Sequence, residues 1–368
     1  MTDQQELPVR LRPEIVALRA YRQGRVCAVD TFKLSSNENP FHPLPSVLER
    51  VRAVGDINRY PDASAAELCA ALAEVYVMRF DEVIVGAGAV AILAQLISAA
   101  AGVGDEVVYA WRSFEAYPLL ITTAGATGVP VPLRLDATHD LTAMAQAITE
   151  RTRVVIVCNP NNPTGTVVTA DDVQAFLARV PSEVLVILDE AYIEFVGDEC
   201  AVDGRRLLSR HPNLVVVRTF SKAFGLAGLR VGFALGHPRI LDAARATALP
   251  LSVTRFAETA ALASLDHREE LFERVRRITE RRDMVRGALL DQGWSTPKSE
   301  ANFLWFDTHE HTESAAGIFE RTGVIVRALP PDGVRVSVGE AGSVDKLLIA
   351  AAEIMGCLPE GHPARRLG

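Results

Sequence analysis

The residue with the clearest chemical potential in this chain is Lys222. The sequence contains four lysines, at positions 33, 222, 298 and 346. Lys222 follows an apolar run at 214–217 that is typical of a buried strand, and Thr219, Ser221 and Arg230 lie close to it in the sequence. An amine in such a place can form an imine with a carbonyl cofactor, and the hydroxyl and guanidinium groups suit a phosphate dianion. The segment therefore indicates pyridoxal phosphate.

A carboxylate occupies a similar position in a second segment, since Asp189 directly follows the apolar run 184–188. A carboxylate at the end of a buried strand is costly unless it meets a positive partner. The protonated pyridine nitrogen of the same cofactor would be such a partner, and Tyr192 could reach the ring hydroxyl. The Asp-Glu-x-Tyr pattern could also ligate a metal or cap a helix. Because no cluster of His and Asp lies nearby, we expect no metal site.

Two turns add further candidates. The segment 159–165, Asn-Pro-Asn-Asn-Pro-Thr-Gly, follows an apolar run and can hold the amide of Asn162 in a fixed direction. Ala87 and Gly88 lie between a short strand and a helix, where small residues let backbone N–H groups and a positive helix end approach a phosphate. Either turn alone could be an ordinary connection, so each indicates a cofactor site only in combination with the other motifs.

The elements that must position these residues form an alternation of short apolar runs and helical segments. Apolar runs without strict alternation suit strands that are buried on both faces of a mostly parallel sheet, and ligands of such sheets bind beyond the carboxyl ends of the strands. We therefore predict an α/β/α sandwich. The expected strands are 83–85, 106–110, 154–158, 184–188, 214–218 and 231–235, and the expected helices include 90–101, 141–148 and 170–178.

The pattern changes after residue 245. A long charged helix over 259–290, interrupted near Asp266, precedes strands near 302–306, 324–327 and 334–338 and a last helix at 344–354. The sequence thus predicts an N-terminal arm (1–45), a large domain (46–245) and a smaller α+β C-terminal domain (246–368). A cleft between two domains is a common place for a ligand.

Composition excludes several classes of function. The net charge is −8 and no long basic run is present, which argues against nucleic-acid binding. The five cysteines include no Cys-x-x-Cys pair, so neither a disulfide framework nor a cysteine-based zinc site is expected. A polar, acidic N-terminus is untypical of a signal peptide, and no apolar run is long enough to span a bilayer. We expect a cytoplasmic protein that has no membrane or nucleic-acid partner.

Taken together, the motifs resemble those of fold-type I pyridoxal-phosphate aminotransferases. The Asn-Pro-Thr-Gly turn, the Asp-x-x-Tyr pattern and the Ser-Lys pair with a later Arg occur here in that order. The segments 36–40, 58–62 and 333–339 are similar to the histidinol-phosphate aminotransferase branch, and the resemblance covers nearly the whole chain. It implies an internal aldimine on Lys222, a ping-pong mechanism and a homodimer.

The resemblance also implies a role for individual residues. Lys222, Asp189 and Tyr192 would be catalytic, and Lys222 would shuttle the proton of the substrate. Tyr60 would reach the cofactor of the partner subunit. The expected contacts to the cofactor come from Ala87, Gly88, Phe114, Asn162, Asp189, Tyr192, Thr219, Ser221, Lys222 and Arg230. The expected contacts to the substrate come from Arg335, Arg327, Tyr21 and Asn37.

The motifs that indicate the cofactor leave the substrate open. Segments such as 111–118 resemble the actinobacterial aromatic aminotransferases, which exchange the amino group between Phe, Tyr or Trp and a 2-oxo acid such as 2-oxoglutarate. Tyr21, Phe114 and Phe256 could form an apolar wall for an aromatic ring. Arg335 suits a carboxylate and a phosphate equally, so histidinol-phosphate aminotransfer is the alternative. A lyase acting on threonine phosphate and a cofactor-binding regulator are further alternatives, although the arm is too short and too rich in Pro and Asn for a helix-turn-helix.

Overall fold

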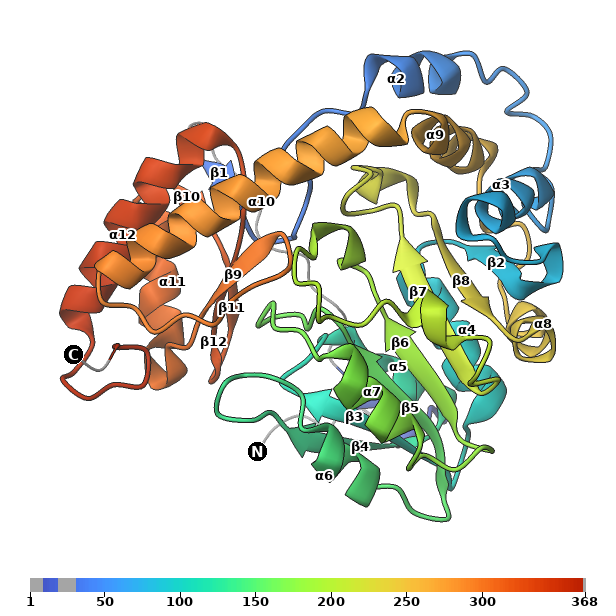
Figure 1. Ribbon diagram of the computed structural model, residues 1–368, viewed down its shortest axis with the longest axis horizontal. Helices are drawn as coiled ribbons and strands as arrows, with labels where there is room; N and C mark the ends of the chain where they lie inside the picture. Colours follow the sequence, from blue (N-terminus) through green and yellow to red (C-terminus); the bar gives the residue numbers. More distant parts are fainter. Residues whose placement is uncertain (1–8, 19–30, 367–368) are drawn as a thin grey trace.

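A seven-stranded sheet forms the centre of the molecule (Figure 1). The computed structural model describes residues 9–18 and 31–366. All strands of this sheet run in one direction except β8, which is antiparallel to both of its neighbours. In spatial order the strands are β2 (Val83–Gly86), β8 (Gly232–Gly236), β7 (Leu214–Thr219), β6 (Leu185–Asp189), β5 (Thr152–Cys158), β3 (Glu106–Trp111) and β4 (Thr127–Pro132).

Helices cover both faces of the sheet because successive strand residues point to opposite sides. On one face, Val154 and Ile156 pack with α4 (Ala89–Ala100), α5 (Ala116–Ala124) and α8 (Pro238–Ala246). On the other face, Val155 and Val157 pack with α6 (Leu141–Gln146) and α7 (Ala170–Leu177). The predicted α/β/α sandwich is confirmed.

The same second face continues over β7 and β8 into a further cluster. There the strands contact α3 (Ala66–Tyr76) and α9 (Arg255–Asp266), and α2 (Pro45–Arg52) packs against α9. The short turns η1 (Phe80–Glu82), η2 (Ile193–Phe195), η3 (Gly204–Leu207) and η4 (Ala227–Leu229) lie in connections between the sheet strands and helices, and α1 (Pro13–Val16) contacts α5.

A second, smaller unit contains the C-terminal elements. Its antiparallel sheet has the order β11 (Arg327–Leu329), β12 (Gly333–Ser337), β9 (Phe303–Phe306). The helices α10 (Arg268–Asp291), α11 (Thr312–Arg321) and α12 (Val344–Cys357) supply its core together with the sheet. The short turns η5 (His309–His311) and η6 (Ala341–Ser343) connect them. In Figure 1 the long helix α10 runs from α9 to this unit.

Three details depart from the sequence prediction. β4 was missed because Pro130 and Pro132 argue against a strand, and it is tolerated since it lies at the edge of the sheet. Within the predicted arm, β1 (Phe32–Lys33) pairs with β10 (Val324–Ile325) of the C-terminal unit. The predicted long helix is divided at His267 into α9 and α10, and α9 packs on α2 and α3 rather than on the C-terminal sheet. The division into domains at residues 45 and 245 stays a prediction.

No helix in the described ranges is both long enough and apolar enough to cross a bilayer.

Candidate active site

A cavity of about 780 Å³ opens beyond the carboxyl ends of the parallel strands, beside the C-terminal unit. Its wall combines the ends of β5, β6 and β7, the N-terminal turns of α4 and α5, the segment 36–38 and one residue of β12. Most of the predicted site residues lie on this wall: Asn37, Phe114, Asn162, Asp189, Tyr192, Thr219, Ser221, Lys222, Arg230 and Arg335.

Lys222 follows the end of β7 and donates a hydrogen bond from Nζ to the carbonyl oxygen of Ser36, at 3.1 Å. Burial, and then the positive charge of Arg335, lower the pKa of Lys222 from its usual 10.5 to about 7. A lowered pKa leaves a larger fraction of the amine neutral near pH 7, and only the neutral amine is a nucleophile or a proton acceptor.

Asp189 is the last residue of β6 and its side chain lies at the bottom of the cavity. Its Oδ2 accepts a hydrogen bond from the hydroxyl of Tyr117 at 2.7 Å, and its Oδ1 accepts one from the backbone N–H of Ala191 at 3.2 Å. Burial raises the pKa of Asp189 from 3.8 to about 6, although both hydrogen bonds lower it. No cationic side chain of the described residues forms an ion pair with Asp189, so no positive group in this part of the chain matches its charge.

The neighbouring carboxylate has a different environment because adjacent strand residues face opposite ways. Glu190 is fully buried and accepts hydrogen bonds from Arg218, at 2.9 Å from Nε and 2.7 Å from Nη2. It also accepts a hydrogen bond from the backbone N–H of Gly204 at 2.6 Å. Glu190 is thus paired within the protein, and Asp189 is the carboxylate that faces the cavity.

A group of donors around Arg230 can receive an anion. The guanidinium group of Arg230 donates from Nη1 to the Ser221 hydroxyl at 3.3 Å, and the Thr219 hydroxyl accepts the Ser221 backbone N–H at 3.1 Å. Gly88 has a φ of +84°, and a Cβ built on it would lie 2.5 Å from Nη2 of Arg230. Only glycine allows this close approach of the backbone to the guanidinium group. Ala87 precedes it and does not line the cavity.

A second set of contacts joins the segment 36–38 to the cavity. Asn37, with a φ of 53°, donates from Nδ2 to the Tyr192 hydroxyl at 2.9 Å, and its backbone N–H donates to the Ser337 hydroxyl at 2.8 Å. Arg335 donates to Oδ1 of Asn162 at 2.6 Å and to the Ser35 carbonyl oxygen at 2.7 Å. With its Oδ1 engaged by Arg335, Asn162 keeps its Nδ2 donors for the cavity.

Besides Ala87 and Gly88, three predicted residues of the described part of the chain do not line the cavity. Arg327 donates from Nη2 to Oε1 of Glu115 at 2.6 Å, and it is Glu115 that lies on the wall. Tyr60 is 85% exposed and lies outside the cavity of its own chain. Phe256 begins α9 and is likewise absent from the wall, so it provides no apolar surface there. Tyr21 lies outside the described residues.

Sequence reasoning missed several residues that matter for the geometry. Tyr117 is fully buried and holds Asp189, and the carbonyl oxygen of Ser36 accepts from Lys222. Tyr117 lies in the first turn of α5, three residues after Phe114, and the two ring centroids are 5.5 Å apart. This spacing was the one available signal. The apolar part of the wall was also missed; it consists of Val90, Leu93, Leu119 and Leu120.

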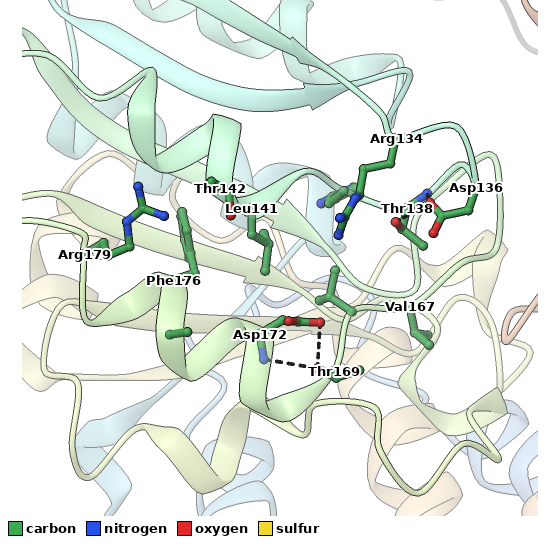
Figure 2. A pocket seen from close by; sticks show the side chains of 13 residues that line it. Arg134, Asp136, Thr138, Leu141, Thr142, Val167, Thr169, Asp172, Phe176 and Arg179 are labelled. Carbon is green, nitrogen blue, oxygen red and sulfur yellow. Dashed lines mark hydrogen bonds between the residues drawn. The ribbon is translucent and has the colours of Figure 1, made fainter.

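A smaller cavity of about 300 Å³ lies between α6, α7 and the loop after β4 (Figure 2). Arg134 and Arg179 lie on opposite sides of it in this view, and the Thr169 hydroxyl donates to Asp172 at 2.7 Å. None of its residues is shared with the larger cavity, and none was predicted as a site residue. The predicted chemistry therefore belongs to the larger cavity.

Comparison with known proteins agrees with this geometry. Residues 29–354 match the family model described as aminotransferase class I and II. The chain is 51% identical over 348 residues to an aromatic amino acid aminotransferase of Thermobifida fusca, and the aligned region covers 94% of this chain and 97% of the relative. It is 48% identical to an aromatic amino acid aminotransferase of Streptomyces coelicolor, covering 95% and 98%. Among solved structures, histidinol-phosphate aminotransferase from Sinorhizobium meliloti in complex with pyridoxal-5'-phosphate has a TM-score of 0.85 and 28% identity, covering 96% of this chain and 100% of that one.

Proposed function

This chain belongs to the class I and II aminotransferases, which depend on pyridoxal 5'-phosphate, and from that premise we propose that it transfers amino groups between an aromatic amino acid and a 2-oxo acid such as 2-oxoglutarate. The observation that carries the substrate class is the identity of about half of the residues, over 94% of the chain, to a relative named for aromatic amino acids. The apolar wall formed by Phe114 and residues of α4 and α5 suits an aromatic side chain.

The residues of the cavity fit pyridoxal phosphate. The close approach of Gly88 to Arg230, together with Ser221 and Thr219, provides donors for a phosphate. Asp189 is a buried carboxylate that lacks a positive partner among the described residues, and a pyridinium nitrogen would supply one. When bound, the cofactor contributes a carbonyl group for amines and a ring that accepts electrons.

The chain's own residues would divide the remaining work. Lys222 would attach the cofactor and then hold and return the Cα proton at its Nζ, for which a pKa of about 7 is well placed. Phe114 would stack on the cofactor ring, while Asn162 and Tyr192 would donate hydrogen bonds to the ring oxygen. Asn37 would orient the hydroxyl of Tyr192 through its 2.9 Å hydrogen bond.

Arg335 would bind the substrate carboxylate. Its guanidinium group is held at the cavity wall by Asn162 and by the Ser35 carbonyl, so its direction is fixed before the substrate arrives. Arg327 is engaged by Glu115, and its role in substrate binding would require exchange of that ion pair. The predicted contact of Tyr21 with the substrate stays a prediction.

A homodimer completes the proposal. Tyr60 is 85% exposed on its own chain, which is consistent with a role at the phosphate of a partner subunit's cofactor. Within its own subunit, Ala87 would support the cofactor phosphate through its backbone, beside Gly88. We also propose a cytoplasmic location, in line with the cysteines at 69, 158, 200 and 357, which are free thiols.

The alternative substrate is histidinol phosphate. The structural relative named for that reaction is 28% identical, and the arginines Arg335 and Arg327 could serve a phosphate as well as a carboxylate. The test is to mix the holoenzyme separately with phenylalanine and with histidinol phosphate and to measure kcat/KM with 2-oxoglutarate as acceptor. We expect phenylalanine to exceed histidinol phosphate by at least tenfold. A preference for histidinol phosphate would overturn the substrate assignment and leave the aminotransferase assignment intact.

A further inference from the structure

A group of histidines and carboxylates lies in the C-terminal unit, outside the active-site cavity. It joins η5 to the segment that follows α12. Glu310, His311 and His362 each offer one ligand atom, and these three atoms lie within 4.8 Å of one another. The ring of His309 is also close, with its centroid 5.8 Å from that of His362. Two imidazoles and a carboxylate thus converge from two distant parts of the sequence, and the His309 ring lies nearby with its Nε2 3.4 Å from Oδ2 of Asp307.

His362 is the residue that points to a ligand. His362 is only 7% exposed, and the Nε2 atom of its ring has no hydrogen-bond partner within the described part of the chain. A buried polar atom that lacks a partner costs free energy, and such atoms are uncommon in folded proteins.

The backbone around His362 is firmly held. The N–H of Ala364 donates to Nδ1 of His362 at 3.1 Å, and the N–H of Ser295 donates to the Ala364 carbonyl oxygen at 2.7 Å. Arg365 donates from Nη2 to the carbonyl oxygens of Met355 and Leu358, at 2.7 and 2.8 Å. The loop that carries His362 is therefore fixed beside η5 by the Ser295 and Arg365 contacts, which do not depend on the ring contact to Ala364.

We propose that Glu310, His311 and His362 bind one transition-metal ion of the zinc type, with water as the fourth ligand. Imidazole nitrogens with one carboxylate suit zinc and its neighbours in the transition series, whereas magnesium and calcium prefer ligand sets made of oxygen alone. Ligand atoms around a tetrahedral zinc lie about 3.4 Å apart, as follows from metal–ligand distances of about 2.1 Å. Glu310 is largely exposed and can move by the small distance required.

One existing contact would change on binding. Because Nδ1 of His362 accepts the Ala364 N–H, the proton of the neutral ring lies on Nε2. Coordination by Nε2 requires that proton to move to Nδ1, and the Ala364 contact would then be lost. Metal coordination is far stronger than one neutral hydrogen bond, so the exchange favours the bound state.

The consequence would be structural. The metal would link η5, which lies between β9 and α11, to the segment after α12, and this link would hold the C-terminal residues on the domain. It lies apart from the residues that line the active-site cavity, so amino transfer does not depend on it.

The test uses the untagged holoenzyme after dialysis against a chelator and then against metal-free buffer. We expect calorimetric titration with zinc chloride at pH 7.5 to give one ion per chain with micromolar or tighter affinity. Elemental analysis of the zinc-loaded protein, after unbound zinc has been removed by dialysis, should give the same ratio. Zinc should also slow the release of C-terminal residues by carboxypeptidase Y, a protease that does not itself require zinc.

Variants separate this site from other places where zinc can bind. His362→Gln and Glu310→Gln should each weaken the affinity at least tenfold, and His267→Gln, which alters an exposed histidine elsewhere, should leave it unchanged. Glu310 has a side chain that is 74% exposed, so Glu310→Gln tests the site even if the buried His362 variant folds poorly. The absence of stoichiometric binding, or equal binding by wild type and Glu310→Gln, would overturn the proposal.

Discussion

Replacement of Asp189 by Asn should make the apoenzyme more stable at neutral pH while impairing cofactor binding. Asp189 is buried, and burial raises its pKa from 3.8 to about 6. Among the described residues, its carboxylate accepts hydrogen bonds from the Tyr117 hydroxyl and the Ala191 N–H and from no cationic side chain. The folded state therefore disfavours the charged carboxylate at pH values where the unfolded chain carries it. Asn has nearly the same shape and carries no charge.

The size of the effect follows from the two pKa values. A difference between 3.8 and about 6 corresponds to roughly 3 kcal/mol of folding free energy above pH 7. Because the pKa of Asp189 is higher in the folded state than in the unfolded state, its ionisation lowers the folding stability as the pH rises. The cost is absent below about pH 3, well under the unfolded pKa of 3.8, where both states are protonated; it grows as the pH rises and is complete above the folded pKa. About half of the cost is present at pH 5.

The assay is thermal unfolding of both apoproteins at equal protein concentration, from pH 5 to pH 8. For a chain of 368 residues, roughly 3 kcal/mol corresponds to about 4 °C in Tm, so Asp189→Asn should melt about 4 °C higher at pH 8 and about 2 °C higher at pH 5. Added pyridoxal phosphate should reverse the order, because the cofactor stabilises only the protein that can pair with its ring nitrogen. A variant that melts below wild type at pH 8 in the apo form, or a difference that does not change with pH, would refute the reasoning.

Three other predictions concern the same cavity. Tyr117→Phe should lower kcat/KM about 10- to 100-fold with intact folding, because Asp189 loses a hydrogen bond to its charged form; an unchanged kcat/KM would show that this contact is dispensable. Gly88→Ala should weaken pyridoxal-phosphate affinity at least tenfold in a fluorescence titration, because the added Cβ would lie 2.5 Å from Nη2 of Arg230. Gly102→Ala is the control: a Cβ at that position meets no atom within 4 Å, so this variant should bind the cofactor normally. The rate at which pyridoxal phosphate adds to the apoenzyme should rise with pH and level off above about pH 7, the pKa of Lys222, rather than near 10.5; a rate that still rises tenfold per pH unit at pH 9 would contradict the lowered pKa.

The central sheet could be predicted closely because its signal is local. The strands β5, β6 and β7 are apolar runs bounded by polar turns, and the residues that follow them meet at one edge in any parallel sheet. For the same reason the sequence could bring Asn162, Asp189 and Lys222 to one cavity. β4 was not predictable on this basis, because its two prolines are acceptable only at an edge, and an edge position is a property of the assembled sheet.

Contacts between distant elements lay beyond the sequence pattern. Tyr117 reaches Asp189 across the interface of α5 and β6, and the pairing depends on how deeply the helix packs on the sheet. Arg327 turns to Glu115 because β11 of the C-terminal unit lies beside the N-terminal end of α5. The cluster of His309, His311 and His362 likewise exists only because the segment after α12 folds back on η5. Such pairings are set by tertiary packing, and no spacing along the chain encodes them.

The central claim is that Lys222 is the residue that carries the cofactor, and covalent trapping tests it most directly. The holoenzyme is reduced with borohydride, digested and analysed by mass spectrometry, so that any lysine joined to pyridoxal phosphate carries the added mass permanently. The chain offers three internal controls, Lys33, Lys298 and Lys346. We predict the modification on the peptide that contains Lys222 and on none of the other three. Modification of another lysine with Lys222 unmodified, or no modified peptide from a protein that retains activity, would contradict the account.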